Sequence, residues 1–201
     1  MVQIARDEKV VQEILEAARA IFSQYGLKKT TMDDVAKAIG KGKSTLYYYY
    51  PGKNELFEAV VVDELKKSVR LTREAINGKT TPKEKLKALV LQRFETKKHL
   101  HNLGRVIYQD IFANFQRICS LKKQFEEIQV EFIKEIIVGG IQLGEFREMT
   151  ADEITFFAHW AIAGFNGLVL PIYTSECIME SDHSCDKVVD LLLYGIAKRQ
   201  G

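Results

Sequence analysis

Hydrophobic residues recur every three to four positions along most of this chain, which is the spacing of amphipathic helices. In the first such segment the apolar positions run from Val10 to Tyr25, and Gly26 follows as a helix stop. No segment alternates apolar and polar residues in the way that a half-buried β-strand does. The pattern therefore predicts an all-α protein of about nine helices.

Threonines followed by an acidic residue three positions later mark three helix starts. In such a capping box each of the two side chains hydrogen-bonds the backbone N–H of the other residue. The pairs are Thr31 with Asp34, Thr81 with Glu84, and Thr150 with Glu153. With Gly and Pro as stops, the predicted helices after Gly26 cover approximately residues 31–39, 43–50, 54–77, 82–99, 105–117, 121–143, 150–171 and 184–199.

One region, residues 154–175, contains no Asp, Glu, Lys or Arg and is long enough to cross a membrane. His159 and Asn166 interrupt its apolar character. Glu153 and Glu176 flank it, where a membrane helix has basic residues. We interpret the region as a helix buried in a core or in a subunit interface, and we expect no membrane partner.

Length and composition narrow the class of protein further. The 201 residues, of which 46% are hydrophobic and 28% charged, suffice for a core that needs no disulfide or metal ion. Three cysteines without a Cys-x-x-Cys spacing indicate reduced thiols. The charged N-terminus lacks the apolar segment of a signal peptide. We therefore expect a cytoplasmic protein with no cofactor and no metal site.

The net charge of +2 is unevenly spread along the chain. Residues 28–53 hold six lysines against two aspartates, whereas residues 56–201 hold 20 basic and 20 acidic side chains. A positive patch in the N-terminal quarter favours a polyanionic partner, although many protein surfaces carry such a patch by chance.

The same quarter contains two short predicted helices that are joined by Gly40, Lys41 and Gly42, the arrangement of a helix-turn-helix. If Leu46 of the second helix packs against the first, Ser44 and Tyr48 point away from that contact at 100° per residue. Hydroxyl side chains on this outer face suit a DNA major groove, because short polar residues allow close approach to base edges. The alternative is that residues 47–50 are aromatic residues of the core and its rim.

These motifs resemble the DNA-binding region of the TetR family of bacterial transcriptional regulators. Three pieces stand in the register of the family, namely Phe22-x-x-Tyr25-Gly26, Thr30-Thr31-Met32-x-x-Val35-Ala36-x-x-x-Gly40, and Lys43-Ser44-Thr45-Leu46-Tyr47-x-x-Tyr50-Pro51-Gly52-Lys53-x-x-Leu56. The resemblance is specific over about residues 6–60. It implies an N-terminal three-helix helix-turn-helix DNA-binding domain, residues 1–53, and a C-terminal helical ligand-binding and dimerisation domain, residues 54–201.

The resemblance also implies which residues contact double-stranded DNA. They are Thr31, Lys41, Lys43, Ser44, Thr45, Tyr47, Tyr48, Tyr49 and Lys53. Lys41 and Gly42 depart from the family, which has an apolar residue and a Ser or Thr helix cap at these positions. We therefore expect an additional phosphate contact from Lys41 and a recognition helix without a side-chain cap.

One recognition helix contacts too few bases for useful selectivity, so the resemblance implies a homodimer on a palindrome. Its two recognition helices would lie about 34–36 Å apart. The uncharged helix and the last helix are the expected dimer seam; the alternative is that both are buried within one subunit. An unidentified small-molecule effector is expected among the remaining helices, where aromatic residues are dense. Its candidate contacts are His99, Tyr108, Phe112, Phe115, Phe132, Trp160 and Asn166, each of which is otherwise a core residue.

The sequence therefore predicts a ligand-responsive DNA-binding transcriptional regulator, with repression as the family default. The repressor would bind its palindromic operator as a dimer and would be released by a small hydrophobic or aromatic effector. We expect no enzymatic activity, because no nucleophile elbow, P-loop or His-Glu-x-x-His motif occurs. The alternative is a ligand-independent DNA-binding protein that acts architecturally or through a protein partner.

Overall fold

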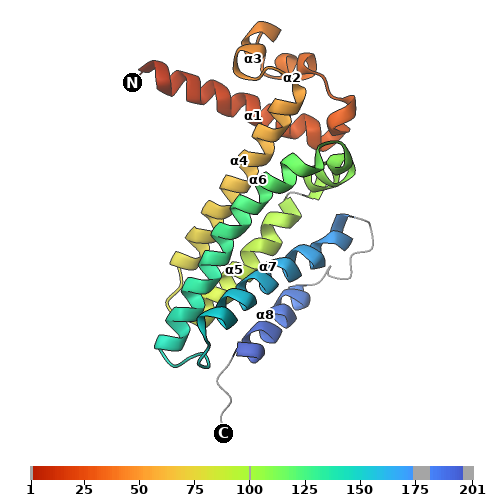
Figure 1. The fold of residues 1–201 in the computed structure, drawn as a ribbon. Helices are drawn as coiled ribbons and strands as arrows, with labels where there is room; N and C mark the ends of the chain where they lie inside the picture. Colours follow the sequence, from red (N-terminus) through yellow and green to blue (C-terminus); the bar gives the residue numbers. More distant parts are fainter. Residues whose placement is uncertain (1, 100, 174–181, 197–201) are drawn as a thin grey trace. The chain divides into compact units, whose positions relative to one another are not determined.

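A computed structural model describes the backbone of residues 2–99, 101–173 and 182–196, with side chains for residues 7–96, 120–167 and 187–194. Every regular element in these ranges is a helix (Figure 1), which confirms the predicted all-α fold. The helices are α1 (Val2–Lys29), α2 (Met32–Ala38), α3 (Lys43–Tyr49), α4 (Lys53–Asn77), α5 (Pro82–His99), α6 (His101–Gln142), α7 (Ala151–Tyr173) and α8 (Asp182–Ile196).

The described ranges hold eight helices, not nine, because α6 is continuous where the sequence analysis expects two helices. Helix α5 does end at His99 as predicted, but α6 already begins at His101, so residues 102–104 are helical and not a break. The expected interruption at residues 118–120 is wrong. No proline lies in α6, and a glycine such as Gly104 costs a helix interior only about 1 kcal/mol relative to alanine. Gly26 does interrupt α1 as predicted, with a φ of 80° and a ψ of 162°.

The chain forms two compact units, each of which is described by itself. The N-terminal unit consists of Met1–Lys66 and Asn102–Cys119, and the C-terminal unit of Lys67–His101 and Ser120–Gly201. Both α4 and α6 contribute residues to each unit. The functional boundary between residues 53 and 54 stays a prediction.

The core of the N-terminal unit forms where α1, α2, α3 and α4 bury their apolar stripes. Ile14, Val35 and Leu46 have no exposed surface. Phe22 and Phe57 pack edge to face, with ring centroids 5.2 Å apart, a favoured geometry for aromatic pairs. At the edge of this core, Arg19 pairs with Glu64 at 3.0 Å and so ties α1 to α4.

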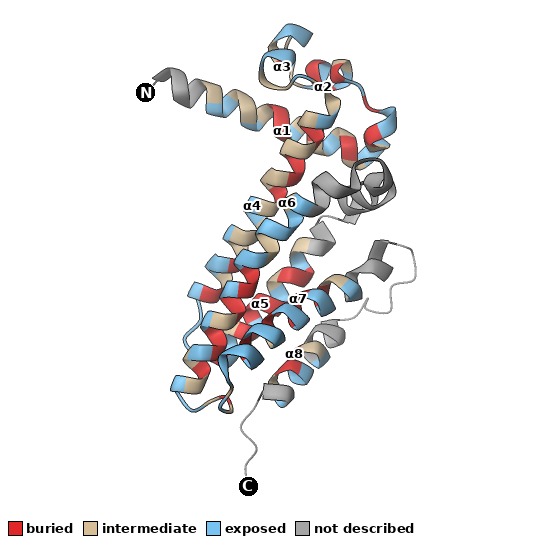
Figure 2. Cartoon of the chain, viewed as in Figure 1, coloured by how far each residue is buried: buried red, intermediate tan, exposed pale blue. Residues whose placement is uncertain are grey.

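A second core fills the C-terminal unit and draws buried apolar residues from α4 through α8 (Figure 2). Helix α8 packs against α5, and Val189 and Leu192 of α8 belong to the same core as Ala158 of α7. Gly140 near the end of α6 lies so close to the Phe146 ring that a β-carbon would overlap it. The turn after α6 is therefore held by tight packing.

The three predicted capping boxes all form. The backbone N–H of Asp34, Glu84 and Glu153 each donates to the threonine hydroxyl three residues earlier, at 3.2–3.3 Å. Each acidic side chain in turn accepts a hydrogen bond from the backbone N–H of its threonine, at 2.7–3.1 Å.

Among the described helices, none combines the length and the hydropathy that a bilayer span requires. The three cysteine side chains lie outside the described residues.

Candidate nucleic-acid interface

The turn between α2 and α3 is fixed by backbone hydrogen bonds. Gly40 adopts a φ of 64°, and the N–H groups of Gly40 and Lys41 donate to the carbonyls of Lys37 at 3.1 Å and Ala36 at 3.0 Å. This is the pattern of a Schellman motif, whose left-handed residue is usually glycine. Gly42 then precedes α3 with no side-chain cap, as the sequence predicts.

Helix α3 packs on α2 and turns one face outward. Leu46 is fully buried, whereas Ser44, Tyr47 and Tyr48 are exposed and Thr45 is half-buried. The side chain of Tyr48, 80% exposed, makes an edge-to-face contact with Tyr49 at 5.0 Å. The predicted outward direction of Ser44 and Tyr48 is thus confirmed, and Tyr47 and Tyr48 are not core residues.

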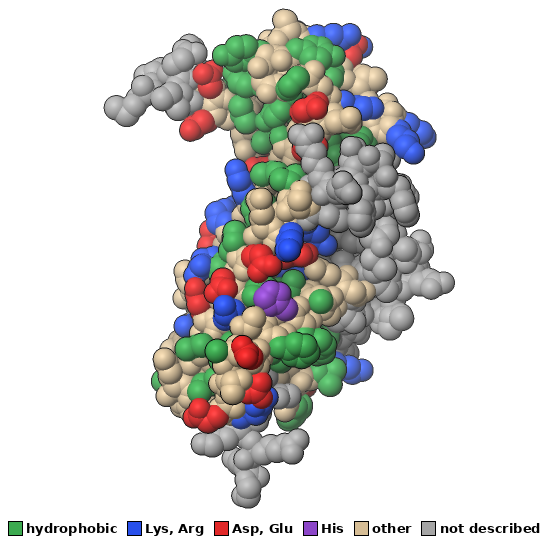
Figure 3. All heavy atoms as spheres, viewed as in Figure 1, with side chains coloured by type: hydrophobic (Ala, Val, Ile, Leu, Met, Phe, Trp, Pro, Cys, Tyr) green, Lys and Arg blue, Asp and Glu red, His purple; other side chains and the backbone are tan. Residues whose placement is uncertain are grey.

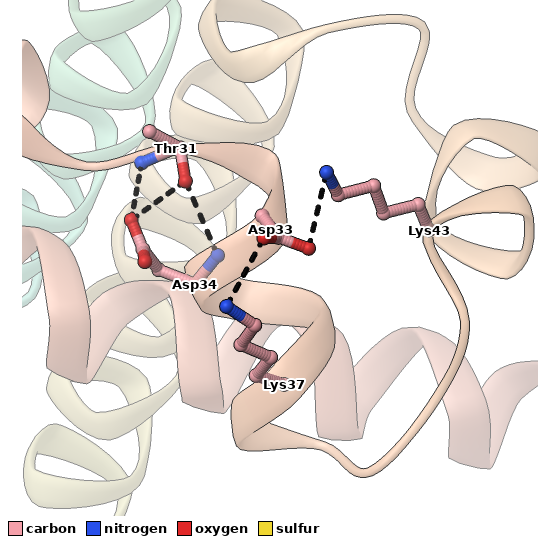
Figure 4. A network of polar contacts seen from close by, with 5 residues as sticks. All are labelled: Thr31, Asp33, Asp34, Lys37 and Lys43. Carbon is pink, nitrogen blue, oxygen red and sulfur yellow. Dashed lines mark hydrogen bonds and ion pairs between the residues drawn. The ribbon is translucent and has the colours of Figure 1, made fainter.

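The lysine at the start of α3 is held by α2 (Figure 4). Lys43 Nζ lies 3.2 Å from Asp33 Oδ1, and Lys37 Nζ lies 3.2 Å from Asp33 Oδ2. Hydrogen bonds from Lys37 and then Lys43 lower the pKa of Asp33. The two lysine side chains are 75% and 58% exposed, and Asp33 is half-buried. Ion pairs that water reaches in this way are weak enough to exchange for phosphate.

Thr31 is engaged in its own helix cap (Figure 4). Its hydroxyl donates to Asp34 Oδ2 at 2.7 Å and accepts the N–H of Asp34 at 3.3 Å. The hydrogen bonds from the hydroxyl and the N–H of Thr31 lower the pKa of Asp34. A phosphate contact from this hydroxyl would therefore have to replace its bond to Asp34.

The other predicted DNA contacts each have a partner elsewhere in the N-terminal unit. Tyr49 donates its hydroxyl to Asp7 Oδ1 at 3.2 Å, and desolvation followed by that hydrogen bond raises the pKa of Tyr49. Lys41 Nζ lies 3.6 Å from Glu13 Oε2, and Lys53 Nζ donates to the carbonyl of Lys28 at 3.4 Å. Sequence reasoning missed these partners because they lie 25 to 42 positions away.

Known proteins resemble this chain in sequence. The family model for bacterial regulatory proteins of the tetR family matches residues 14–60. The HTH-type transcriptional regulator YhgD of Bacillus subtilis is 32% identical over 143 residues, 69% of this chain and 74% of the relative. The chain belongs to the TetR family.

Two further TetR-like proteins extend the comparison. The HTH-type transcriptional repressor KstR2 of Mycolicibacterium smegmatis is 30% identical over 141 residues. These residues are 67% of this chain and 66% of KstR2, just under two thirds of its length. The crystal structure of FadR from Bacillus subtilis in complex with stearoyl-CoA has a TM-score of 0.68 at 21% identity and covers 92% of this chain and 98% of FadR. It shares the fold.

As a member of the TetR family, this chain is a DNA-binding transcriptional regulator, and α3 corresponds to its recognition helix. Lys43 begins α3, with Lys41 before the helix and Lys53 after it, and lysines are the cations that DNA phosphates attract. The exposed hydroxyl of Ser44 on α3 is a short polar group of the kind that reaches base edges. The roles of the individual residues stay a prediction.

The predicted effector contacts lie in different surroundings. Phe132 is buried beneath the guanidinium of Arg73, whose carbon is 4.1 Å from the ring centroid. Asn166 is half-buried, and both the oxygen and the nitrogen of its side-chain amide are hydrogen-bonded. Trp160 is 54% exposed and so does not share the surroundings of Phe132. The side chains of His99, Tyr108, Phe112 and Phe115 lie outside the described residues.

Sequence reasoning missed Arg93, which is only 7% exposed within the C-terminal unit. Its guanidinium carbon lies 5.3 Å from the centroid of the Phe165 ring. A signal was present in the sequence, because Arg93 continues the inward stripe of Leu86, Leu89 and Val90 on α5. An arginine on such a stripe is rarely buried unless its charge is paired.

Helices α7 and α8 also present uncovered apolar faces. Phe156, Trp160, Leu191 and Tyr194 are 54–81% exposed, and exposed hydrophobic side chains are visible at the surface in Figure 3. Further along the same face of α7, Gly164 and Gly167 have open space where a β-carbon would stand. Large residues followed by small ones make a surface that another helix can approach closely.

Among the described side chains, no group of His, Cys, Asp and Glu is placed to hold a metal ion.

Proposed function

We propose that this protein is a dimeric repressor that acts in the cytoplasm, binds a palindromic operator through α3 and is released by a small apolar effector. The observation that carries the proposal is the outward face of α3. Ser44 and Tyr48 are exposed there, and Lys43, itself mostly exposed, pairs with the half-buried Asp33 of α2. Short hydroxyls beside exchangeable cations are what a DNA groove and its phosphates require.

The dimer is supported by the exposed stripe of α7, made up of Phe156, Trp160, Gly164 and Gly167, together with Leu191 and Tyr194 of α8. An apolar surface of this kind marks a contact with another protein chain. A second copy of the chain meets it with the same stripe, as two-fold symmetry demands. We propose that these two helices pair with their copies and present two recognition helices to one site.

Repression and effector control are supported by what is known of similar proteins. KstR2 is a repressor by name, and FadR has been crystallised with stearoyl-CoA. Release from DNA follows by linkage. If the ligand binds more tightly to the conformer whose recognition helices are wrongly spaced for the operator, it lowers operator affinity by the ratio of its affinities for the two conformers. Helix α4 contributes residues to both units, and we propose that its tilt carries the effect.

The decisive experiment is selection of binding sites from a random DNA pool with the purified full-length protein. We expect a palindrome whose half-sites are about one helical turn apart. Thr45→Ala should relax the preference at particular bases, whereas Lys53→Ala should weaken binding to all sequences alike and flatten its salt dependence. Recovery of no shared sequence at low salt would refute the proposal.

A further inference from the structure

Three polar side chains of the C-terminal unit, on α5, α6 and α7, are linked by hydrogen bonds, and a fourth polar side chain is buried on α6. Arg93 on α5 donates from Nη2 to Asn166 Oδ1 on α7 at 3.3 Å. Asn166 Nδ2 donates in turn to Glu126 Oε1 on α6 at 2.7 Å. Gln129 lies one helical turn after Glu126 on α6. Arg93 and Gln129 are 7% and 6% exposed, so each is more than nine-tenths buried.

Two atoms of this cluster have no partner. Arg93 Nε and Gln129 Oε1 are both shielded from solvent and make no hydrogen bond. Buried polar atoms are nearly always paired in native proteins, because an unpaired one loses its bond to water and gains nothing in return. The buried side chains thus leave one donor, the Arg93 Nε–H, and one acceptor, the Gln129 amide oxygen, unpaired.

The charge of the cluster is also incomplete. Glu126 Oε1 lies 3.4 Å from Lys122 Nζ, so one carboxylate serves two cations, Lys122 and Arg93. Burial lowers the pKa of Arg93 to about 10, which still leaves the guanidinium charged at neutral pH. One positive charge therefore has no matching carboxylate among these contacts, and a monoanion would balance it.

The surroundings of the guanidinium are aromatic and aliphatic. Its planar group faces the Phe165 ring at 5.3 Å, and Phe94 packs edge to face against Phe165 at 6.3 Å. Phe94 and Phe165 belong to the apolar core of the unit. A ligand that reaches Arg93 therefore meets an apolar environment with one cationic end.

We propose that Arg93 and the amide of Gln129, both buried in the C-terminal unit, bind the carboxylate of a small acid whose body is apolar. Arg93 Nε–H donates to a carboxylate oxygen, and Gln129 presents its N–H₂ after a half-turn of its amide. Phe94 and Phe165 contact the apolar body. This proposal rests on the proposed effector control and specifies the chemical class of the effector.

The test compares decanoate with decanamide, which have the same length and differ in charge, by calorimetric titration of the full-length protein below micellar concentrations. We expect decanoate to bind wild type about tenfold more tightly than decanamide, since only decanoate forms charge-assisted hydrogen bonds. Arg93→Met should bring the two affinities within about twofold of each other. The matched control is Arg70→Met, because Arg70 is exposed on α4 and pairs with Glu74 at 2.9 Å; it should keep the tenfold preference.

Three results would overturn the proposal: equal affinities in wild type, a preference for decanoate that survives in Arg93→Met, or no binding of any straight-chain monocarboxylate. Arg93→Met should fold, because an apolar replacement of a buried ion is often tolerated. If it does not, Arg93→Lys keeps the charge without the Nε–H and should show a reduced preference. Operator affinity measured in parallel separates the two proposals: decanoate that binds through Arg93 without releasing DNA contradicts effector control alone.

Discussion

Each of the two units has cations that are candidates for binding an anion, and these cations lie in opposite surroundings. In the N-terminal unit, Lys37 and Lys43 share Asp33 at the surface, with most of each lysine side chain in solvent. In the C-terminal unit, Arg93 is buried, and its hydrogen-bonded partner among the described side chains is Asn166. An ion pair at the surface is screened by water, so its lysine exchanges partners readily. A buried cation has little water around it, so the groups that contact it in the core must stabilise its charge. The first arrangement suits exchange with DNA phosphates, and the second suits a ligand.

The largest effect on operator affinity is expected from disrupting the proposed dimer contact, because that contact holds both recognition helices on one DNA site. Trp160→Glu places a charge in the proposed dimer seam on α7, so we expect a monomer in sedimentation. Its operator affinity should fall by about 100-fold or more, because the linked second half-site is lost. Leu143→Glu is the matched control, since Leu143 is 69% exposed outside that stripe. A monomeric Trp160→Glu that binds operator like wild type would contradict the dimeric mode.

The packing of the C-terminal unit is tested by two adjacent glycines. Gly140→Ala pushes a β-carbon into the Phe146 ring and should lower the free energy of unfolding by about 1–3 kcal/mol. Gly139→Ala meets nothing within 4 Å and should raise it slightly, because alanine favours the helix. Urea denaturation of both variants measures the difference. Equal stabilities would show that the turn after α6 tolerates the added carbon.

The exchangeable surface cations are tested by Asp33→Asn, which releases Lys37 and Lys43 from their carboxylate. We expect affinity for all DNA sequences to rise by about threefold to tenfold, with a steeper dependence on salt. Fluorescence anisotropy over a range of salt concentrations measures both quantities. Asp152→Asn makes the same change of charge in the C-terminal unit and should alter binding less. A loss of affinity in Asp33→Asn would mean that Asp33 positions Lys43 for DNA.

The smallest effect concerns the helix caps in acid. Hydrogen bonds from Thr31, Thr81 and Thr150 lower the pKa values of Asp34, Glu84 and Glu153 from the ordinary 3.8 and 4.5. A lowered pKa in the folded state means that the caps stabilise the protein above about pH 4.5 and lose this effect as pH falls further.

We expect Glu84→Gln to make stability less dependent on pH below about 4.5, as measured by thermal unfolding. Glu148→Gln removes a carboxylate that caps no helix and serves as the control. An acid limb that is the same in Glu84→Gln and in wild type would contradict the assignment of the cap.

Local signals predicted much of the DNA-binding region. The capping box of Thr31 and the left-handed Gly40 act over three to five residues, so the sequence around them is sufficient. The outward face of α3 followed from helical spacing around Leu46. The exposure of Trp160 did not follow, because an uncharged helix can be buried by its own chain or by a second copy.

Sequence alone determined the all-α fold, the three capped helix starts and the face that α3 presents, because each depends on neighbours within a turn or two of helix. Only tertiary structure decided that α6 is continuous, that Asp7 and Tyr49 meet, and that Arg93 is buried beside Phe165. Asp7 and Tyr49 are 42 positions apart, and Arg93 and Phe165 are 72 positions apart. Whether such residues meet depends on how whole helices pack, and periodicity within one helix carries no information about its neighbours.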